Sequence, residues 1–151
     1  MNNNSMKLVP IHKGEELFRY IPQRPPFVLV DVLYEKGALH VVSGFTINKD
    51  NPLLERGLLT EGGLVENIAQ TAALFAGVRF ADQGLAVPIG YIAGIKDLEI
   101  KQLPAAGTSI YTRTTLTHDL VNIQVVEGEV FDEQDQLIAR CELRIFIKGD
   151  E

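Results

Sequence analysis

The sequence has no tryptophan and only one cysteine, Cys141, among its 151 residues. A single thiol cannot form an intramolecular disulfide or surround a metal ion with thiolates. The chain also lacks an apolar run of the roughly 18 residues that a membrane-spanning helix needs. Its first five residues are polar, with no basic segment followed by an apolar one. We therefore expect no secretory signal, no membrane contact and a reducing, cytoplasmic location.

Basic residues are also scarce. The chain has 14 Lys and Arg against 20 Asp and Glu, a net charge of −6, and its basic residues are scattered. Proteins that bind nucleic acid usually carry a basic face, so we exclude this class, whereas a local basic patch can still steer an acidic protein partner. With 46% hydrophobic residues, the composition is typical of a globular protein. We expect one domain over residues 1–151, with residues 1–9 disordered or extended.

The pattern of apolar residues changes along the chain. The sequence predicts a short amphipathic segment at 14–21, two strands at 27–34 and 39–47, and a loop at 48–56. Residues 60–80 then have helical spacing with very little polar surface, which predicts a helix that is buried on most sides. Further strands are expected at 88–103, 109–117, 121–131 and 137–148. One helix without a polar face among antiparallel strands indicates an α+β fold, with a sheet curled around the helix.

Three segments carry a resemblance to a known family. Residues 21–31 read Ile-Pro-Gln-Arg-Pro-Pro-Phe-Val-Leu-Val-Asp, and residues 66–72 read Glu-Asn-Ile-Ala-Gln-Thr-Ala. Residues 91–95 read Tyr-Ile-Ala-Gly-Ile and are followed by Lys101 and by an Ala-Gly pair at 106–107. In this order they resemble the motifs of the 3-hydroxyacyl-[acyl-carrier-protein] dehydratases, which have the hotdog fold.

The resemblance implies a hotdog fold, in which an antiparallel sheet wraps around one long central helix. It also implies acyl-ACP or acyl-CoA thioesters as substrates, in fatty-acid, polyketide or aryl-polyene-type biosynthesis, and no metal or organic cofactor. The family's organisation further implies a homodimer, which can assemble into a trimer of dimers.

One departure from the family concerns its histidine. In the family, a Gly-His-Phe-Pro-Gly segment precedes the central helix, but residues 52–57 here read Pro-Leu-Leu-Glu-Arg-Gly, in a shorter loop. The three histidines, His12, His40 and His118, lie elsewhere and are poor replacements, although His40 could reach a neighbouring site across a dimer. The resemblance therefore supports the fold more strongly than the reaction.

The resemblance also places candidate site residues on the helix. Glu66 matches the family's catalytic carboxylate, and Gln70 lies one turn later on the same face. The backbone amides of Gly62 and Gly63, at the helix N-terminus, could hold a thioester carbonyl. The alternatives are a Glu66 at the helix edge that pairs with Arg79 or with a backbone donor, and glycines that only permit tight packing.

Two further candidates lie after the helix, in the predicted strand 88–103. Tyr91 could line an acyl pocket between helix and sheet, and Gly94 could let a ligand approach the backbone closely. The alternatives are ordinary core packing for Tyr91 and a β-bulge for Gly94. Cys141 is expected to be an unreactive core residue.

The sequence leaves three functions open. The first is a 3-hydroxyacyl-ACP dehydratase-like lyase with Glu66 as its acid and base. The second is an acyl-CoA or acyl-ACP thioesterase that uses the same helical carboxylate. The third is a non-catalytic protein that binds an acyl carrier or completes a heterodimer, which the absence of the family histidine would suit.

Overall fold

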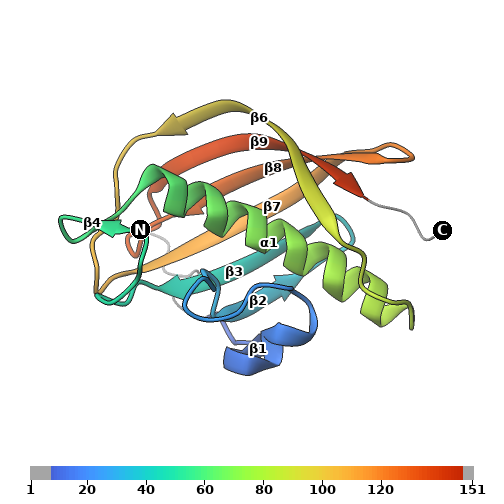
Figure 1. The fold of residues 1–151 in the computed structure, drawn as a ribbon, viewed down its shortest axis with the longest axis horizontal. Helices are drawn as coiled ribbons and strands as arrows, with labels where there is room; N and C mark the ends of the chain where they lie inside the picture. Colours follow the sequence, from blue (N-terminus) through green and yellow to red (C-terminus); the bar gives the residue numbers. More distant parts are fainter. Residues whose placement is uncertain (1–7, 148–151) are drawn as a thin grey trace.

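The computed structural model describes residues 8–147, so most of the segment expected to be disordered lies outside it. A seven-stranded antiparallel sheet, in the order β1-β2-β3-β7-β8-β9-β6, curls around the helix α1 (Glu61–Asp82) (Figure 1). This confirms the predicted α+β hotdog architecture. The strands of the sheet are β1 (His12–Lys13), β2 (Val32–Lys36), β3 (His40–Thr46), β6 (Gly90–Ile100), β7 (Ser109–Asp119), β8 (Ile123–Phe131) and β9 (Leu137–Ile147).

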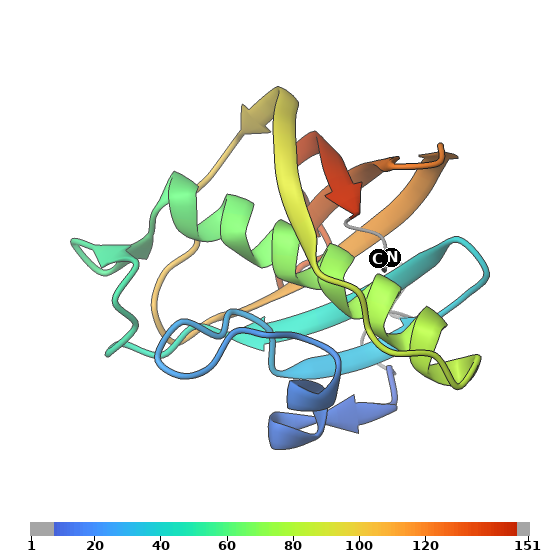
Figure 2. The same ribbon diagram turned by 45° about the vertical axis from the view of Figure 1, so that its right-hand side comes forward.

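Helix α1 crosses the inner face of the sheet, and apolar residues surround it (Figure 2). Its N-terminal half packs in a buried cluster with Leu64 and Ile68, and its C-terminal half in a second cluster with Leu74 and Phe75. Thr60 caps the helix, because its Oγ1 accepts a hydrogen bond from the Gly63 amide at 3.2 Å. None of the helices in residues 8–147 is long and apolar enough to cross a membrane.

The strand predicted at 27–34 was wrong in its first half, because β2 begins only at Val32. At Leu29 the backbone pairs with side chains of α1 instead of with a neighbouring strand, whereas Asp31 N–H already donates to the Gly44 carbonyl of β3 at 2.9 Å. Leu29 N–H donates to Gln70 Oε1 at 2.7 Å, and Leu29 C=O accepts from Asn67 Nδ2 at 2.7 Å. These buried side-chain partners satisfy groups that a sheet ladder would otherwise satisfy.

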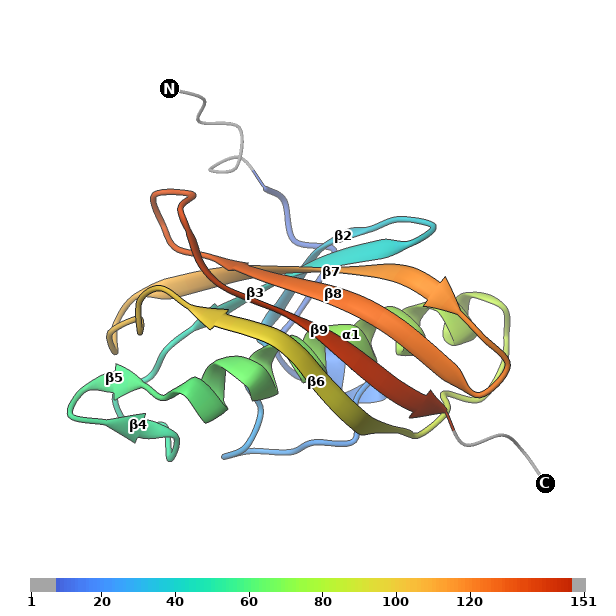
Figure 3. The same cartoon turned by 90° about the horizontal axis from the view of Figure 1, so that it is seen from above.

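The predicted loop at 48–56 contains part of a small hairpin. Strands β4 (Leu54–Glu55) and β5 (Leu58–Leu59) pair beside the start of α1 (Figure 3). Arg56 and Gly57, which connect them, both have positive φ values of 55° and 77°. Two consecutive residues of this kind form the tight turn that suits a two-residue hairpin. The segment predicted at 14–21 forms the 3-10 helix η2 (Gly14–Arg19).

Strand β6 lies at one edge of the sheet and pairs only with β9. In Figure 1 it passes over the helix at the opposite side of the sheet from β1 and β2. Several of its apolar side chains are exposed, among them Tyr91, Ile92, Ile95 and Leu98. A long apolar edge strand is a surface that natural proteins usually cover.

Close packing of α1 against the N-terminal segment depends on a glycine. A Cβ atom at Gly77 would lie 2.6 Å from the backbone oxygen of Tyr20, whereas one at Gly62 would meet nothing closer than 4.0 Å. We predict that Gly77→Ala lowers the free energy of unfolding by about 1–3 kcal/mol, because backbone atoms must move apart. The matched change Gly62→Ala should be neutral or stabilising by up to about 1 kcal/mol. Urea denaturation of both variants measures the difference, and equal stabilities would contradict this packing.

Candidate active site

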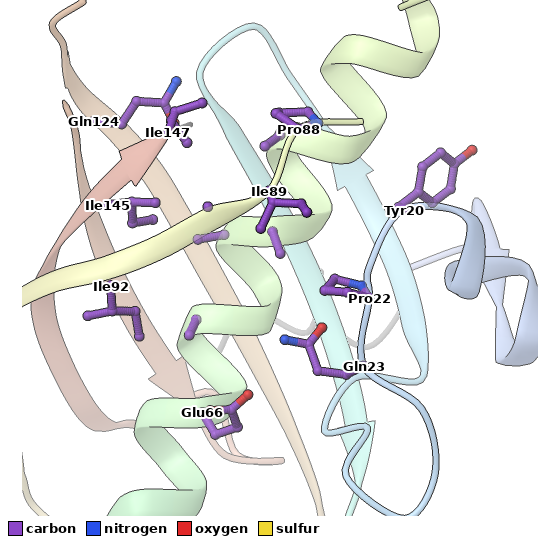
Figure 4. Close-up of a pocket in the computed structure, with 15 residues that line it drawn as sticks. Tyr20, Pro22, Gln23, Glu66, Pro88, Ile89, Ile92, Gln124, Ile145 and Ile147 are labelled. Atoms are coloured by element: carbon purple, nitrogen blue, oxygen red, sulfur yellow. The ribbon is translucent and has the colours of Figure 1, made fainter. Parts of the chain in front are cut away.

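A cleft of about 170 Å³ lies between α1, residues 20–23 and the neighbouring ends of β6 and β9 (Figure 4). Its floor on the helix consists of four alanines, which are spaced so that they share one face: Ala69, Ala72, Ala73 and Ala76. The opposite wall is aliphatic and includes Ile92, Ile145 and Ile147. The cleft is therefore apolar along most of its length.

Glu66 lies at one end of this cleft, one turn before the alanines (Figure 4). Its side chain is half-buried, and Oε2 accepts a hydrogen bond from Gln70 Nε2 at 2.9 Å. The alternative ion pair with Arg79 is not formed, because Arg79 pairs with Asp119 at 3.5 Å. The arrangement combines a carboxylate of fixed orientation with an apolar channel beside it.

Gln70 holds Glu66 in place and is fully buried. Besides its bond to Glu66, Nε2 donates to the Phe27 carbonyl at 2.9 Å, while Oε1 accepts from Leu29 N–H at 2.7 Å. Both the oxygen and the nitrogen of the Gln70 amide are therefore already hydrogen-bonded to protein groups. Gln70 therefore links the position of Glu66 to that of the 27–29 segment.

The two glycines at the start of α1 do not line the cleft of this protomer. The Gly63 amide is occupied by Thr60 Oγ1, and a Cβ atom at Gly63 would lie 2.5 Å from Leu59 Cδ1. Close packing, the alternative that the sequence left open, therefore accounts for Gly63. Gly62 is exposed. Outside helix α1 itself, its amide has no backbone hydrogen-bond partner among the described residues.

Tyr91 and Gly94 lie on the edge strand β6 and do not line the cleft of this protomer either. The side chain of Tyr91 is 53% exposed and opposite Phe146 of β9. Gly94 lies at a register shift between β6 and β9, which matches the β-bulge alternative. A Cβ atom there would have open space, so steric crowding does not require glycine.

The remaining chemically reactive groups lie away from the cleft. No imidazole lines the cleft within the described residues, although His12 contacts the hydroxyl of Tyr20, which does line it. His40 contacts Glu35, and His118 contacts Thr117. Burial raises the pKa of the Cys141 thiol to about 11, in agreement with an unreactive core residue. No group of three or more His, Cys, Asp or Glu side chains in residues 8–147 could hold a metal ion.

The structure also reveals functional features that sequence patterns did not single out. The alanines 69, 72, 73 and 76 form one wall of the cleft, and their i, i+3, i+4, i+7 spacing was the available signal. Gln23 lines the cleft as well, from the N-terminal segment. The only sign of this position in the sequence was that Gln23 is a polar residue within the proline-rich motif at 21–31.

Comparisons with known proteins agree with this geometry. Residues 15–150 match the family described as ApeP-like, ApeP dehydratase. The chain belongs to the ApeP-like dehydratase family. This confirms the hotdog dehydratase resemblance and gives this ApeP-like protein a dehydratase-like function, of the lyase type, in acyl-thioester biosynthesis.

Individual relatives show the same pattern. The protein is 26% identical over 128 residues to 3-hydroxyacyl-[acyl-carrier-protein] dehydratase FabZ of Shewanella denitrificans, covering 78% of this chain and 80% of FabZ. Its fold matches the dehydratase heterocomplex ApeI:P from Xenorhabdus doucetiae with a TM-score of 0.82 at 19% identity, over 95% of this chain and 94% of that one.

A hypothetical thioesterase with coenzyme A from Streptococcus pneumoniae matches less closely. Its TM-score is 0.64 at 12% identity, over 79% of this chain and 86% of that one. At this level of identity the likeness extends to the fold alone. The thioesterase alternative therefore fits the relatives less well than dehydration does.

The hydrogen bonds of Gln70 lead to a prediction about the stability of the protein. Gln70→Leu removes the partners of the Phe27 carbonyl and the Leu29 amide, and should lower the free energy of unfolding by about 2 kcal/mol or more. Gln134→Leu makes the same change in an exposed turn and should alter stability by less than about 0.5 kcal/mol. Chemical denaturation tests both, and a Gln70→Leu protein as stable as the control would exclude the structural role.

Proposed function

We propose that this ApeP-like dehydratase removes water from 3-hydroxyacyl chains that are bound as thioesters to acyl carrier protein or coenzyme A, with Glu66 as its acid and base. The observation that supports this is the position of Glu66 at the end of an apolar cleft. Gln70 occupies Oε2, while Oε1 makes no hydrogen bond to the described residues. One carboxylate oxygen is thus available to a substrate.

The reaction needs a proton to leave C2 and another to reach the departing hydroxyl group. In this proposal the Glu66 carboxylate takes the C2 proton, and the electrons of the C–H bond form the C2=C3 double bond. The C3–O bond breaks, and the protonated Glu66 returns the proton to the hydroxyl, which leaves as water. The product is an enoyl thioester, and a single group suffices if it can reach both positions.

The shape of the cleft suits the acyl chain of such a substrate. From Ala69 to Ala76 the helix advances by about 10 Å at 1.5 Å per residue. Alanine side chains leave room beside the helix, and the isoleucines opposite provide an apolar wall. Removing an alkyl chain from water into this channel is favourable in proportion to its buried area.

We also propose that the protein acts as a dimer joined through β6. This strand has an unpaired edge and exposed apolar side chains, including Ile92, Ile95 and Leu98. Pairing with a second β6 strand would satisfy the edge and cover this surface. Tyr91 and Gly94 would then lie at the interface, where they could contact a substrate that enters between the subunits.

A second candidate function follows from the absence of an imidazole in the cleft. One similar structure is a dehydratase heterocomplex, ApeI:P. By analogy, this chain could bind a related dehydratase through β6, and the partner would supply the missing histidine. In that case the protein alone would bind acyl thioesters but would not dehydrate them.

A panel of 3-hydroxyacyl and saturated acyl thioesters tests these proposals. We expect wild-type protein to convert the 3-hydroxyacyl thioesters to enoyl thioesters, which absorb in the ultraviolet, and to release no free thiol from either set. Glu66→Gln should lower the dehydration rate by at least about 100-fold, because it removes the proton-transferring group. Glu61→Gln, on the same helix but outside the cleft, should leave the rate unchanged.

The outcomes separate the functions. An undiminished rate in Glu66→Gln would exclude this residue as the acid and base, and free thiol would favour thioester hydrolysis. Binding without turnover, followed by turnover when a histidine-bearing dehydratase is added, would favour the heterocomplex.

The proposed interface can be tested by introducing a charged side chain on β6. Ile95→Asp places like charges close together across the β6 edge, so the dissociation constant of the dimer should rise at least about tenfold. Leu39→Asp changes an equally exposed apolar residue in the turn before β3 and should leave the dimer intact. Analytical ultracentrifugation measures both, and a monomeric wild-type protein or a fully dimeric Ile95→Asp variant would contradict the interface.

A further inference from the structure

Four polar side chains line the cleft, and three of them already have partners. The Tyr20 hydroxyl contacts His12 Nε2 at 3.2 Å, Gln124 Nε2 contacts Asp119 Oδ1 at 3.4 Å, and Glu66 is bound by Gln70. The exception is Gln23, whose side chain makes no hydrogen bond within residues 8–147. Its Oε1 atom is buried and unpaired.

A buried amide oxygen without a hydrogen-bond donor is costly and therefore needs a reason. In Figure 4, Gln23 lies at the same end of the cleft as Glu66, with its amide nitrogen on the side of α1. The other cleft-lining amide, that of Gln124, lies at the opposite end (Figure 4). Gln23 thus offers unused hydrogen-bonding capacity at the same end of the cleft as Glu66.

The position of Gln23 is fixed by its neighbours. The Arg24 guanidinium donates to the carbonyls of Ile21 at 2.8 Å, Gln23 at 2.7 Å and Phe18 at 3.1 Å, and it stacks on the Phe18 ring. These contacts hold the backbone around Gln23 to the end of η2. A side chain held on a rigid backbone can bind a substrate group without the entropy cost of ordering a loop.

We propose that Gln23 recognises the 3-hydroxyl group of the substrate and holds it beside Glu66. The proposal rests on the function proposed above, and it assigns Gln23 to binding and positioning. The substrate hydroxyl can donate its proton to Oε1, the atom of Gln23 without a partner, while its oxygen stays free to accept the proton that Glu66 returns. A saturated acyl chain has no group at this position, so Gln23 would distinguish the two substrates.

Binding without turnover tests this role. In the Glu66→Gln protein, which should not dehydrate its ligand, calorimetry would measure the affinities for 3-hydroxyoctanoyl-pantetheine and octanoyl-pantetheine. We expect the hydroxylated thioester to bind about fivefold more tightly, as one net hydrogen bond allows. Methionine has nearly the same shape as glutamine. Adding Gln23→Met to the Glu66→Gln protein should therefore reduce this ratio of affinities to about one and leave the affinity for octanoyl-pantetheine unchanged.

The matched control is Gln124→Met in the same background, at the other end of the cleft, and it should preserve the fivefold ratio. A ratio that survives Gln23→Met would overturn the role of Gln23 while the proposed function stands. Failure of the parent protein to bind either thioester would overturn the proposed function, and this inference with it. Gln23→Leu serves as a second variant, and thermal unfolding of each protein shows that it is folded.

Discussion

The site depends on two buried amides that α1 directs at the backbone before β2. Gln70 and Asn67 are almost fully inaccessible, and together they bind both polar groups of Leu29. Asn67 also accepts a hydrogen bond from Thr112 of β7, so the same side chain links the helix to the sheet. Because a buried amide without partners is destabilising, these bonds fix the register between the helix, the sheet and the N-terminal segment.

This register fixes the positions of two walls of the cleft, the one on α1 and the one formed by the N-terminal segment. Glu66 lies one turn before Gln70 on the helix, and Gln23 lies four residues before Phe27, whose carbonyl Gln70 also binds. A shift of the helix by one turn would separate the carboxylate from the N-terminal segment. The helix therefore needs its few polar residues for position, while its alanines supply the space beside it.

Much of this architecture could be predicted from sequence. The apolar periodicity identified the helix within two residues at its C-terminus, and β9 begins at residue 137, where its strand was predicted. The first half of the strand predicted at 27–34 was wrong, and sequence could not show that the backbone partners of Leu29 are side chains from 38 and 41 residues away. The motif pointed to Glu66, which lies at one end of the cleft, but sequence could not show that Thr60 already occupies the Gly63 amide.

The edge strand explains why the remaining candidates could not be judged by motif alone. Tyr91 and Gly94 belong to a surface that a single protomer leaves uncovered, so their surroundings depend on what pairs with β6. The same dependence applies to the missing imidazole. A second subunit on β6 would cover the apolar surface whether or not it supplies a histidine, since edge pairing uses backbone groups and needs no particular side chain. Absence of the family histidine from this chain is therefore compatible with an intact fold and with the proposed interface, and in the proposed reaction the chemical demand falls on Glu66 and on the group that faces it.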